Sequence, residues 1–178
     1  MVEAPRSEAL PRWTVKRRGH ARSASDDRSR HEPPRAGAHR ESPAPGLSGL
    51  PRSLLGLTVV VVDDDESTLE YFAFALRACG AVVATASTAL DGLRLVEAQR
   101  PDVVLSDIAM VGYDGYWLVR EIRELGARVS LRVPVVATTA YGREHSRDRT
   151  LAAGFSEHLA KPVDPEVLCQ TIAKAAGR

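Results

Sequence analysis

The sequence predicts an α/β fold in which five short parallel strands form one sheet with helices on both faces. From about residue 57, short aliphatic runs alternate five times with longer amphipathic stretches, as expected of βα units. The runs are rich in valine and apolar throughout, which is typical of strands covered on both sides. A chain of 178 residues has room for one such domain and a tail.

Each element can be placed approximately along the chain. The helices should begin at polar caps, which accept hydrogen bonds from the first N–H groups of a helix. The expected strands lie near residues 57–62, 81–85, 102–106, 133–138 and 155–160. The expected caps are Ser67 with Glu70, Thr88 with Asp91, Asp114 before the third helix, and Asp164 followed by Pro165 and Glu166.

Two of the helices differ in how firmly they should hold the sheet. The first carries an apolar stripe with the i, i+3, i+4, i+7 spacing of a buried helix face: Leu69, Phe72, Ala73 and Leu76. The fourth, near residues 143–152, is almost entirely polar and has Leu151 as its main anchor. A helix held so weakly is expected to shift easily.

Residues 1–52 differ in composition from the rest of the chain. They hold 11 Lys or Arg and 6 Asp or Glu, a net +5, whereas residues 53–178 hold 13 and 17, a net −4. Without apolar periodicity, residues 1–52 are expected to form a disordered basic tail before a domain at 53–178. Three interpretations of the tail remain open: a solvated segment, upstream sequence that is not translated, and an arginine-rich arm for nucleic acid or membrane.

Several classes of protein are not expected. No apolar run approaches the ~18–20 residues of a membrane span, and the N-terminus lacks the apolar stretch of a secretory signal. We therefore expect a cytoplasmic protein without a membrane partner. Cys79 and Cys169 belong to no CxxC motif, so both are expected to be reduced thiols in the core.

Acidic residues follow two of the expected strands. Asp63, Asp64 and Asp65 come directly after a run of four valines, and Asp107 follows the third strand. Ligands of an open α/β sheet bind at the carboxyl ends of its strands, so these acids should converge there. Ionised carboxylates that close repel by roughly 4 kcal/mol per pair at 4 Å and an effective dielectric of 20. Bound Mg²⁺ would relieve this repulsion, whereas a helix start alone would explain only the first acids.

A hydroxyl and a cation complete the set. Thr139 closes the fourth aliphatic run, and Lys161 precedes Pro162 after the fifth. Together with the acids, they supply the groups that hold a divalent metal and a phosphoryl group.

These motifs resemble those of bacterial response-regulator receiver domains over residues 57–176. Asp107 follows Asp64 by 43 positions, Thr139 follows Asp107 by 32, and Lys161 follows Thr139 by 22. The resemblance implies a flavodoxin-like doubly wound (βα)5 fold with strand order 2-1-3-4-5. The segments that carry it are VVVVDDDEST, PDVVLSDIAMVGYDG, VPVVATTAYG and HLAKPVD.

The resemblance also implies roles for these residues. Asp107 would accept a phosphoryl group from a phosphohistidine. Asp63 and Asp64 would hold Mg²⁺, together with Asp107 and the backbone carbonyl of Ala109. Thr139 and Lys161 would contact the phosphoryl oxygens, and the peptide before Pro162 is often cis in such domains.

The sequence departs from the family pattern at several positions. Val111 stands where proline is usual, so the loop after the acceptor is expected to be less rigid. Ser106 replaces a commoner aliphatic residue. His158 takes the place of the aromatic residue that reports activation, and it would act either as a pH-responsive switch or as an ordinary strand residue.

Three further positions near the site carry expectations of their own. In the family, the positions of Ala109 and Tyr141 tune how fast water removes the phosphoryl group, and Tyr141 is expected to shield it. Asp65 is expected to be a solvated acid or a first-turn cap.

The function that follows is a phosphoacceptor in two-component signalling. The chain ends shortly after the fifth helix, which favours a stand-alone receiver, a phosphate shuttle, or the detached terminal receiver of a hybrid sensor kinase. The expected partners are a histidine kinase or histidine phosphotransfer protein, and a downstream protein on the face of helix four, strand five and helix five. Nucleic acid is not an expected partner.

Two alternatives have different consequences. A degenerate receiver would dock partners without phosphate. A haloacid-dehalogenase-like phosphatase would use Asp63 as its nucleophile, since Asp63-x-Asp65-x-Ser67 resembles that family's signature, but it would leave Asp107 without a role. A receiver would at most phosphorylate and dephosphorylate itself, and is not expected to be a multiple-turnover enzyme.

Overall fold

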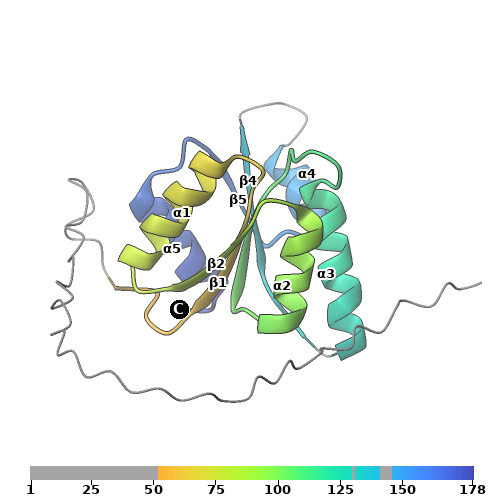
Figure 1. Ribbon diagram of the computed structural model, residues 1–178, viewed down its shortest axis with the longest axis horizontal. Coiled ribbons are helices and arrows are strands. Elements are labelled where there is room, and N and C mark those ends of the chain that lie inside the picture. Colours follow the sequence, from red (N-terminus) through yellow and green to blue (C-terminus); the bar gives the residue numbers. More distant parts are fainter. Residues whose placement is uncertain (1–51, 130, 141–145) are drawn as a thin grey trace, which may run out of the picture. The chain divides into compact units, whose positions relative to one another are not determined.

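The computed structural model describes residues 52–129, 131–140 and 146–178. In this part of the chain, five parallel strands form a sheet in the order β2-β1-β3-β4-β5, as the resemblance implied. Helices α1 and α5 cover one face of the sheet, and α2, α3 and α4 cover the other (Figure 1). The predicted tail, residues 1–52, lies outside the described residues except for Arg52.

Strands and helices alternate along the chain, and each strand lies within two residues of its predicted limits. The elements are β1 (Thr58–Val62), α1 (Glu66–Ala78), β2 (Val82–Ala86), α2 (Ala89–Gln99), β3 (Val103–Asp107), α3 (Gly115–Val129), β4 (Val135–Ala140), α4 (Arg147–Ala152), β5 (Glu157–Lys161) and α5 (Pro165–Ala175).

The sheet divides the core into two clusters because alternate side chains of a strand point to opposite faces. Val59 and Val61 of β1 pack against α1 and α5, whereas Val60 and Val62 belong to the cluster under α2 and α3. The predicted double cover holds for β1, β3 and most of β4. It is wrong for the two edge strands: β2 leaves Val82 64% exposed, and Leu159 is the one buried residue of β5.

The predicted helix caps are confirmed at Thr88 and Asp164, and α3 begins directly after Asp114. The first helix begins earlier than predicted. Its N-cap is Asp65, whose carboxylate accepts a hydrogen bond from the Thr68 N–H at 2.7 Å. Asp65 has extended backbone and is the last residue before the helix, so Ser67 lies inside the first turn and does not cap it.

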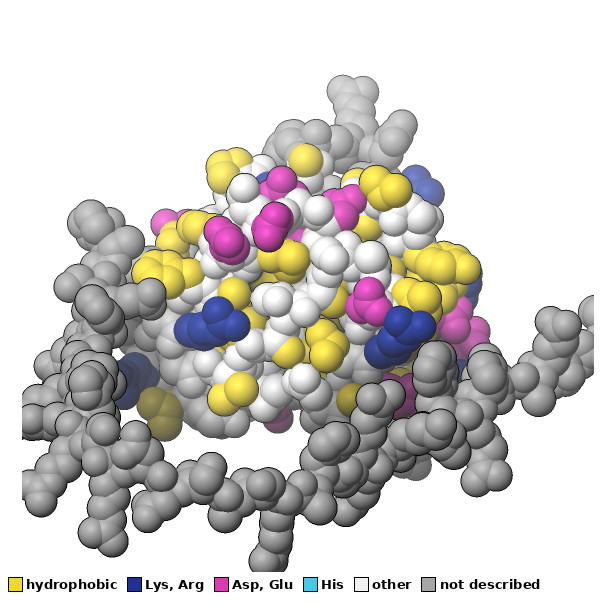
Figure 2. All heavy atoms as spheres, viewed as in Figure 1, with side chains coloured by type: hydrophobic (Ala, Val, Ile, Leu, Met, Phe, Trp, Pro, Cys, Tyr) yellow, Lys and Arg dark blue, Asp and Glu magenta, His cyan; other side chains and the backbone are white. Residues whose placement is uncertain are grey.

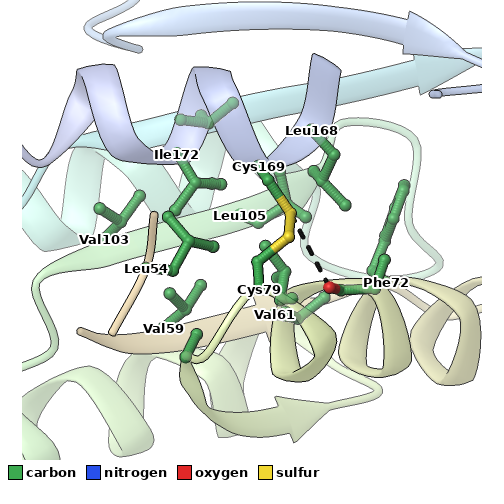
Figure 3. Packing of buried hydrophobic residues seen from close by; sticks show 14 of the residues in the cluster. Leu54, Val59, Val61, Phe72, Cys79, Val103, Leu105, Leu168, Cys169 and Ile172 are labelled. Atoms are coloured by element: carbon green, nitrogen blue, oxygen red, sulfur yellow. Dashed lines mark hydrogen bonds between the residues drawn. A yellow bond between two sulfur atoms is a disulfide. The ribbon is translucent and has the colours of Figure 1, made fainter. Parts of the chain in front are cut away.

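The prediction of two reduced thiols is wrong. Both cysteines are fully buried in the core, as expected, but the structure joins Cys79 to Cys169 in a disulfide across 90 residues of sequence (Figure 3). Cys79 ends α1 and Cys169 lies in α5, and the packing of these helices brings the two Cα atoms to 6.6 Å. That separation suits a disulfide, and it depends on helix packing that the sequence does not display.

The fourth helix is short. It contains six residues, Arg147–Ala152, and Thr150 is the one that is buried. The first part of the predicted element includes residues 143–145, which lie outside the described residues. Among the helices of the described part, none combines the length and apolarity needed to cross a bilayer.

Candidate functional site

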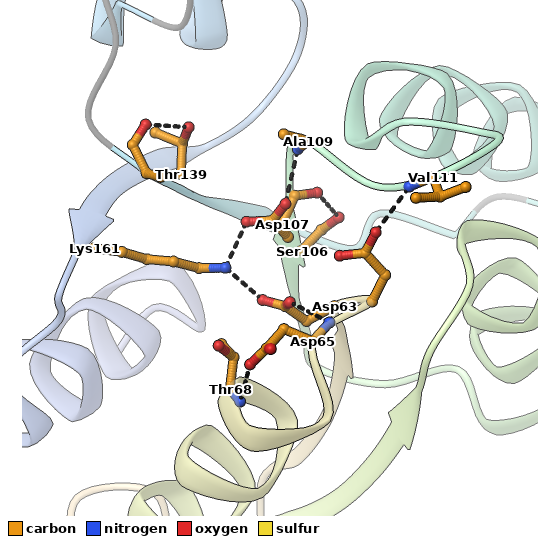
Figure 4. Close-up of polar contacts among 11 residues, drawn as sticks. Asp63, Asp65, Thr68, Ser106, Asp107, Ala109, Val111, Thr139 and Lys161 are labelled. Atoms are coloured by element: carbon orange, nitrogen blue, oxygen red, sulfur yellow. Dashed lines mark hydrogen bonds and ion pairs between the residues drawn. The ribbon is translucent and has the colours of Figure 1, made fainter.

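Three strand ends bring two acids and one lysine together. The Nζ atom of Lys161, at the end of β5, lies 2.7 Å from Oδ2 of Asp63 and 2.6 Å from Oδ1 of Asp107 (Figure 4). Asp63 follows β1 and Asp107 ends β3, the strand next to β1. Both acids are buried, with 1% and 5% of their surface exposed. The predicted convergence of these residues is therefore present.

Burial and pairing act in opposite directions on these charges. Burial raises the pKa of Asp63 above its usual value, although the hydrogen bond from Lys161 opposes this effect. Burial also disfavours the charged form of Lys161, but hydrogen bonds to Asp107 and Asp63 outweigh it and raise the pKa of the lysine. Lys161 is consequently a cation at neutral pH, placed between two carboxylates.

The loop between β3 and α3 contributes two backbone donors. The Ala109 N–H donates to Oδ2 of Asp107 at 2.7 Å, and the Val111 N–H donates to Oδ2 of Asp64 at 2.8 Å. Charge-assisted hydrogen bonds of this kind are stronger than those between neutral groups. One loop thereby fixes carboxylates from two different strand ends.

Two residues to which the sequence analysis gave no role at the site contact the backbone of Asp107. Gly115 begins α3 against the backbone of Asp107, and a Cβ there would overlap the Asp107 carbonyl oxygen. Ser106 was noted only as a change in strand packing, but its buried hydroxyl donates to the same carbonyl at 2.8 Å. The Asp114-Gly115 pair was the available signal, since a glycine behind a helix cap indicates close backbone approach.

Thr139 ends up beside the charged group without contacting it. The residue is buried near the end of β4, and its hydroxyl donates to the Ala140 carbonyl at 3.0 Å. In Figure 4 this hydroxyl points away from Asp107. A contact between Thr139 and a ligand at Asp107 would require rotation of the side chain.

His158 connects the sheet to α4. Its Nδ1 atom lies 3.2 Å from the hydroxyl of Thr150, the buried residue of that helix. The predicted switch position therefore contacts the predicted mobile element. Tyr141, the predicted shield, lies outside the described residues.

The donor set suits a hard cation. Asp63, Asp64, Asp107 and the Ala109 carbonyl offer only oxygen, which Mg²⁺ prefers. Within the described residues, however, no three acidic, histidine or cysteine side chains are arranged as a ready metal cluster. Lys161 supplies the positive charge between Asp63 and Asp107 that was expected of a metal, while one oxygen of Asp64 accepts a hydrogen bond from the Val111 N–H.

The surface around the site is acidic. Asp64, Asp65 and Asp114 are all exposed, and acidic side chains gather at the upper end of the face shown in Figure 2. Such a surface attracts cations and basic partners.

Comparison with known proteins gives consistent results. The family model described as "Response regulator receiver domain" matches residues 59–173. An uncharacterized 14.6 kDa protein of Leptolyngbya boryana is 39% identical over 121 residues, which are 68% of this chain and 91% of that protein. The sensor histidine kinase RcsC of Salmonella typhimurium is 37% identical over 122 residues, but these make up only 12% of RcsC.

Solved structures agree with the fold. A response regulator receiver domain protein from Clostridium thermocellum has a TM-score of 0.62 and 29% identity, covering 68% of this chain and 95% of that one. The structure titled FixJ-N has the same TM-score of 0.62 at 25% identity, covering 70% and 97%.

Proposed function

Because this chain belongs to the response regulator receiver domain family, we propose that Asp107 accepts a phosphoryl group from a phosphohistidine. The observation that supports this most directly is Lys161, which lies within 2.7 Å of carboxylates from two different strand ends. A carboxylate oxygen of Asp107 would attack phosphorus, the P–N bond would break, and its electron pair and a proton would go to the imidazole. Phosphoryl transfer depends mainly on positioning and charge neutralisation, and these are what the site offers.

The chain's own groups divide the work. The Ala109 N–H orients Asp107, and Lys161 neutralises charge on the acceptor and then on the phosphoryl oxygens. Thr139 would turn its hydroxyl from Ala140 toward the phosphoryl group. Mg²⁺, held by Asp63, Asp64, Asp107 and the Ala109 carbonyl, would neutralise charge on the transferred oxygens when bound.

The proposed output is a shift in α4. Rotation of Thr139 and the contact between His158 and Thr150 would bias the position of α4, and so change the docking surface formed by α4, β5 and α5. The donors would be a histidine kinase or histidine phosphotransfer protein, and the compartment the cytoplasm, where the ATP that charges such kinases is found. Ala109 is exposed, and we propose that it and Tyr141 set how fast water reaches the phosphoryl group.

Labelling with acetyl phosphate and Mg²⁺ tests this function. The purified chain should gain the mass of one phosphoryl group, and peptide mapping should place it on Asp107. Asp107→Asn should abolish this label, whereas Asp63→Asn should slow labelling but leave it on Asp107. Label on Asp63 would identify a phosphatase instead. A folded chain that takes no label would be a phosphate-independent docking module.

A further inference from the structure

Asp64 is held differently from the other two acids of the site. Asp63 and Asp107 are buried and paired with Lys161. Asp64 is exposed, and its one hydrogen bond to a described residue comes from the Val111 N–H at 2.8 Å, across 47 positions of sequence. An exposed carboxylate without such a tether would sample several rotamers.

The hydrogen bond from Val111 occupies one oxygen of the Asp64 carboxylate and leaves the other available. Val111 donates to Oδ2 of Asp64, whereas Oδ1 accepts no hydrogen bond from any described residue. A ligand carboxylate is commonly oriented by a hydrogen bond from a neighbouring group, and loss of that group typically weakens metal binding by about 10–100-fold. The Val111–Asp64 contact has this arrangement.

We propose that the backbone N–H of Val111 is a positioning donor that presents Asp64 to the divalent cation. This inference rests on the proposed function, because it assigns Asp64 to a Mg²⁺ site. The N–H group carries the effect and the side chain does not, since the Val111 side chain is 88% exposed. A residue without an N–H at position 111, which can only be proline, could not form the tether.

This distinction supplies a matched pair of variants. Val111→Ala shortens the exposed side chain and keeps the N–H. Val111→Pro removes the N–H, and Val111 is not among the described residues with positive φ, so its backbone lies on the side of φ that proline requires. The two variants therefore separate the donor from the side chain.

Mg²⁺ affinity of the full chain, measured by titration calorimetry, is the primary readout. We expect Val111→Pro to bind Mg²⁺ about tenfold more weakly and Val111→Ala to bind it within twofold of the parent chain. Labelling by acetyl phosphate should be slower in Val111→Pro at low Mg²⁺ and recover at saturating Mg²⁺. Equal affinities in Val111→Pro and the parent, or equal losses in both variants, would overturn the proposal.

A second measurement does not depend on the folding of the proline variant. In the parent chain, the Val111 amide proton should exchange slowly with solvent, and Asp64→Ala should make it exchange at least tenfold faster. Unchanged exchange would contradict the tether. If the parent chain neither binds Mg²⁺ nor takes a phosphoryl group, the proposed function fails as well. If it does both and only the Val111 predictions fail, the inference alone is lost.

Discussion

Helix α4 is attached to the sheet in a different way from α1 and α5, which cover the opposite face (Figure 1). On one face, the disulfide Cys79–Cys169 joins α1 to α5, and the hydroxyl of Tyr71 in α1 donates to the carbonyl of Val163, in the loop just before α5, at 2.7 Å. On the other face, α4 has six residues and only Thr150 is buried. Local opening costs least where few apolar groups are buried, so a change at the strand ends should move α4 before it moves α1 or α5.

The strands that hold the acids also support α1. Asp63 follows β1 and Asp107 ends β3, and the buried stripe of α1 packs on the same two strands through one continuous cluster. Thr139 and His158 lie on β4 and β5, next to α4. The proposed acceptor, Asp107, and the residues next to α4 therefore lie on neighbouring strands. The following experiments test this contrast.

The largest effect is expected from the disulfide. Cross-linking across 90 residues restricts the unfolded chain and should contribute about 4–5 kcal/mol to the free energy of unfolding in the chain-entropy model. Cys79→Ala with Cys169→Ala should lose most of this, measured by urea denaturation. Labelling of Asp107 in the folded variant should persist, because the disulfide lies away from the strand ends.

A reductant supplies the control for this prediction. It should lower the stability of the parent chain and leave that of the double alanine variant unchanged. Cytosolic reductants oppose disulfides, so counting thiols in freshly isolated protein will show which form the cell contains. Two free thiols under non-reducing conditions would remove the covalent part of the contrast between the layers.

In α4, Thr150 is expected to be the main attachment to the sheet. Its hydroxyl donates to the Ser146 carbonyl at 2.9 Å and lies against His158. Thr150→Ala removes this hydroxyl and a buried methyl group, and should cost about 1–2 kcal/mol. Hydrogen exchange in residues 147–152 should accelerate while that of α1 stays unchanged.

Thr150→Ser keeps the hydroxyl and should preserve most of the protection in α4. If Thr150→Ala accelerates exchange equally in α1 and α4, the two layers open together. The proposed independence of α4 would then be wrong.

A smaller effect is expected from the hydrogen bond between the Tyr71 hydroxyl and the Val163 carbonyl, on the face covered by α1 and α5. Tyr71→Phe removes the donor to Val163 and should lower the free energy of unfolding by about 1 kcal/mol. Tyr113→Phe is the matched control, because Tyr113 is 53% exposed and its ring stacks on Trp117, a contact that phenylalanine can keep. Equal stabilities of the two variants would show that the Tyr71 hydroxyl adds nothing to the disulfide.

The sequence allowed the fold to be predicted well because its signals are local. Valine runs, capping residues and the i, i+3, i+4, i+7 stripe of α1 each act within a few residues, and five repetitions of the pattern predict a parallel sheet with helices on both faces. The strand order came from the family resemblance. The burial of Leu69, Phe72, Ala73 and Leu76 confirms the stripe. The predicted strand order already placed β2 at the sheet edge, but the exposure of its side chains was missed because its valines are as apolar as those of the central strands.

Non-local contacts were harder to predict. Convergence of Asp63, Asp107 and Lys161 followed from the rule that strand ends meet, but the role of lysine as the bridging charge did not. The cystine depends on how α1 packs against α5. The donor at Val111 is a backbone N–H. Every residue except proline has this group, so the sequence does not show which N–H makes a contact. These features share one cause: they join segments between 47 and 98 positions apart.

The smallest effect concerns the ion pairs that connect α4, β5 and α5. Glu157 accepts from Lys174 at 2.6 Å and from Arg147 at 3.0 Å. The hydrogen bond from Lys174, followed by the charges of Lys174 and Arg147, lowers the pKa of Glu157 below its usual value. A lowered carboxyl pKa stabilises the fold above the ordinary value near 4.5, and this contribution is lost as pH falls through the lowered pKa.

Both cations are largely exposed, so the contribution should be only about 0.5 kcal/mol. Glu157→Gln should lower stability by this amount at pH 7 and by nothing once the pH is below the lowered pKa. Glu97→Gln is the matched control for loss of a surface carboxylate, because Glu97 is an exposed glutamate of α2 that has no ion pair in the described part of the chain. A loss in Glu157→Gln that persists at acid pH would show that Glu157 acts by packing. In that case contacts that do not depend on charge would hold α4 against β5. Helix α4 would then be attached about as firmly as α5, and the proposed difference between them would be wrong.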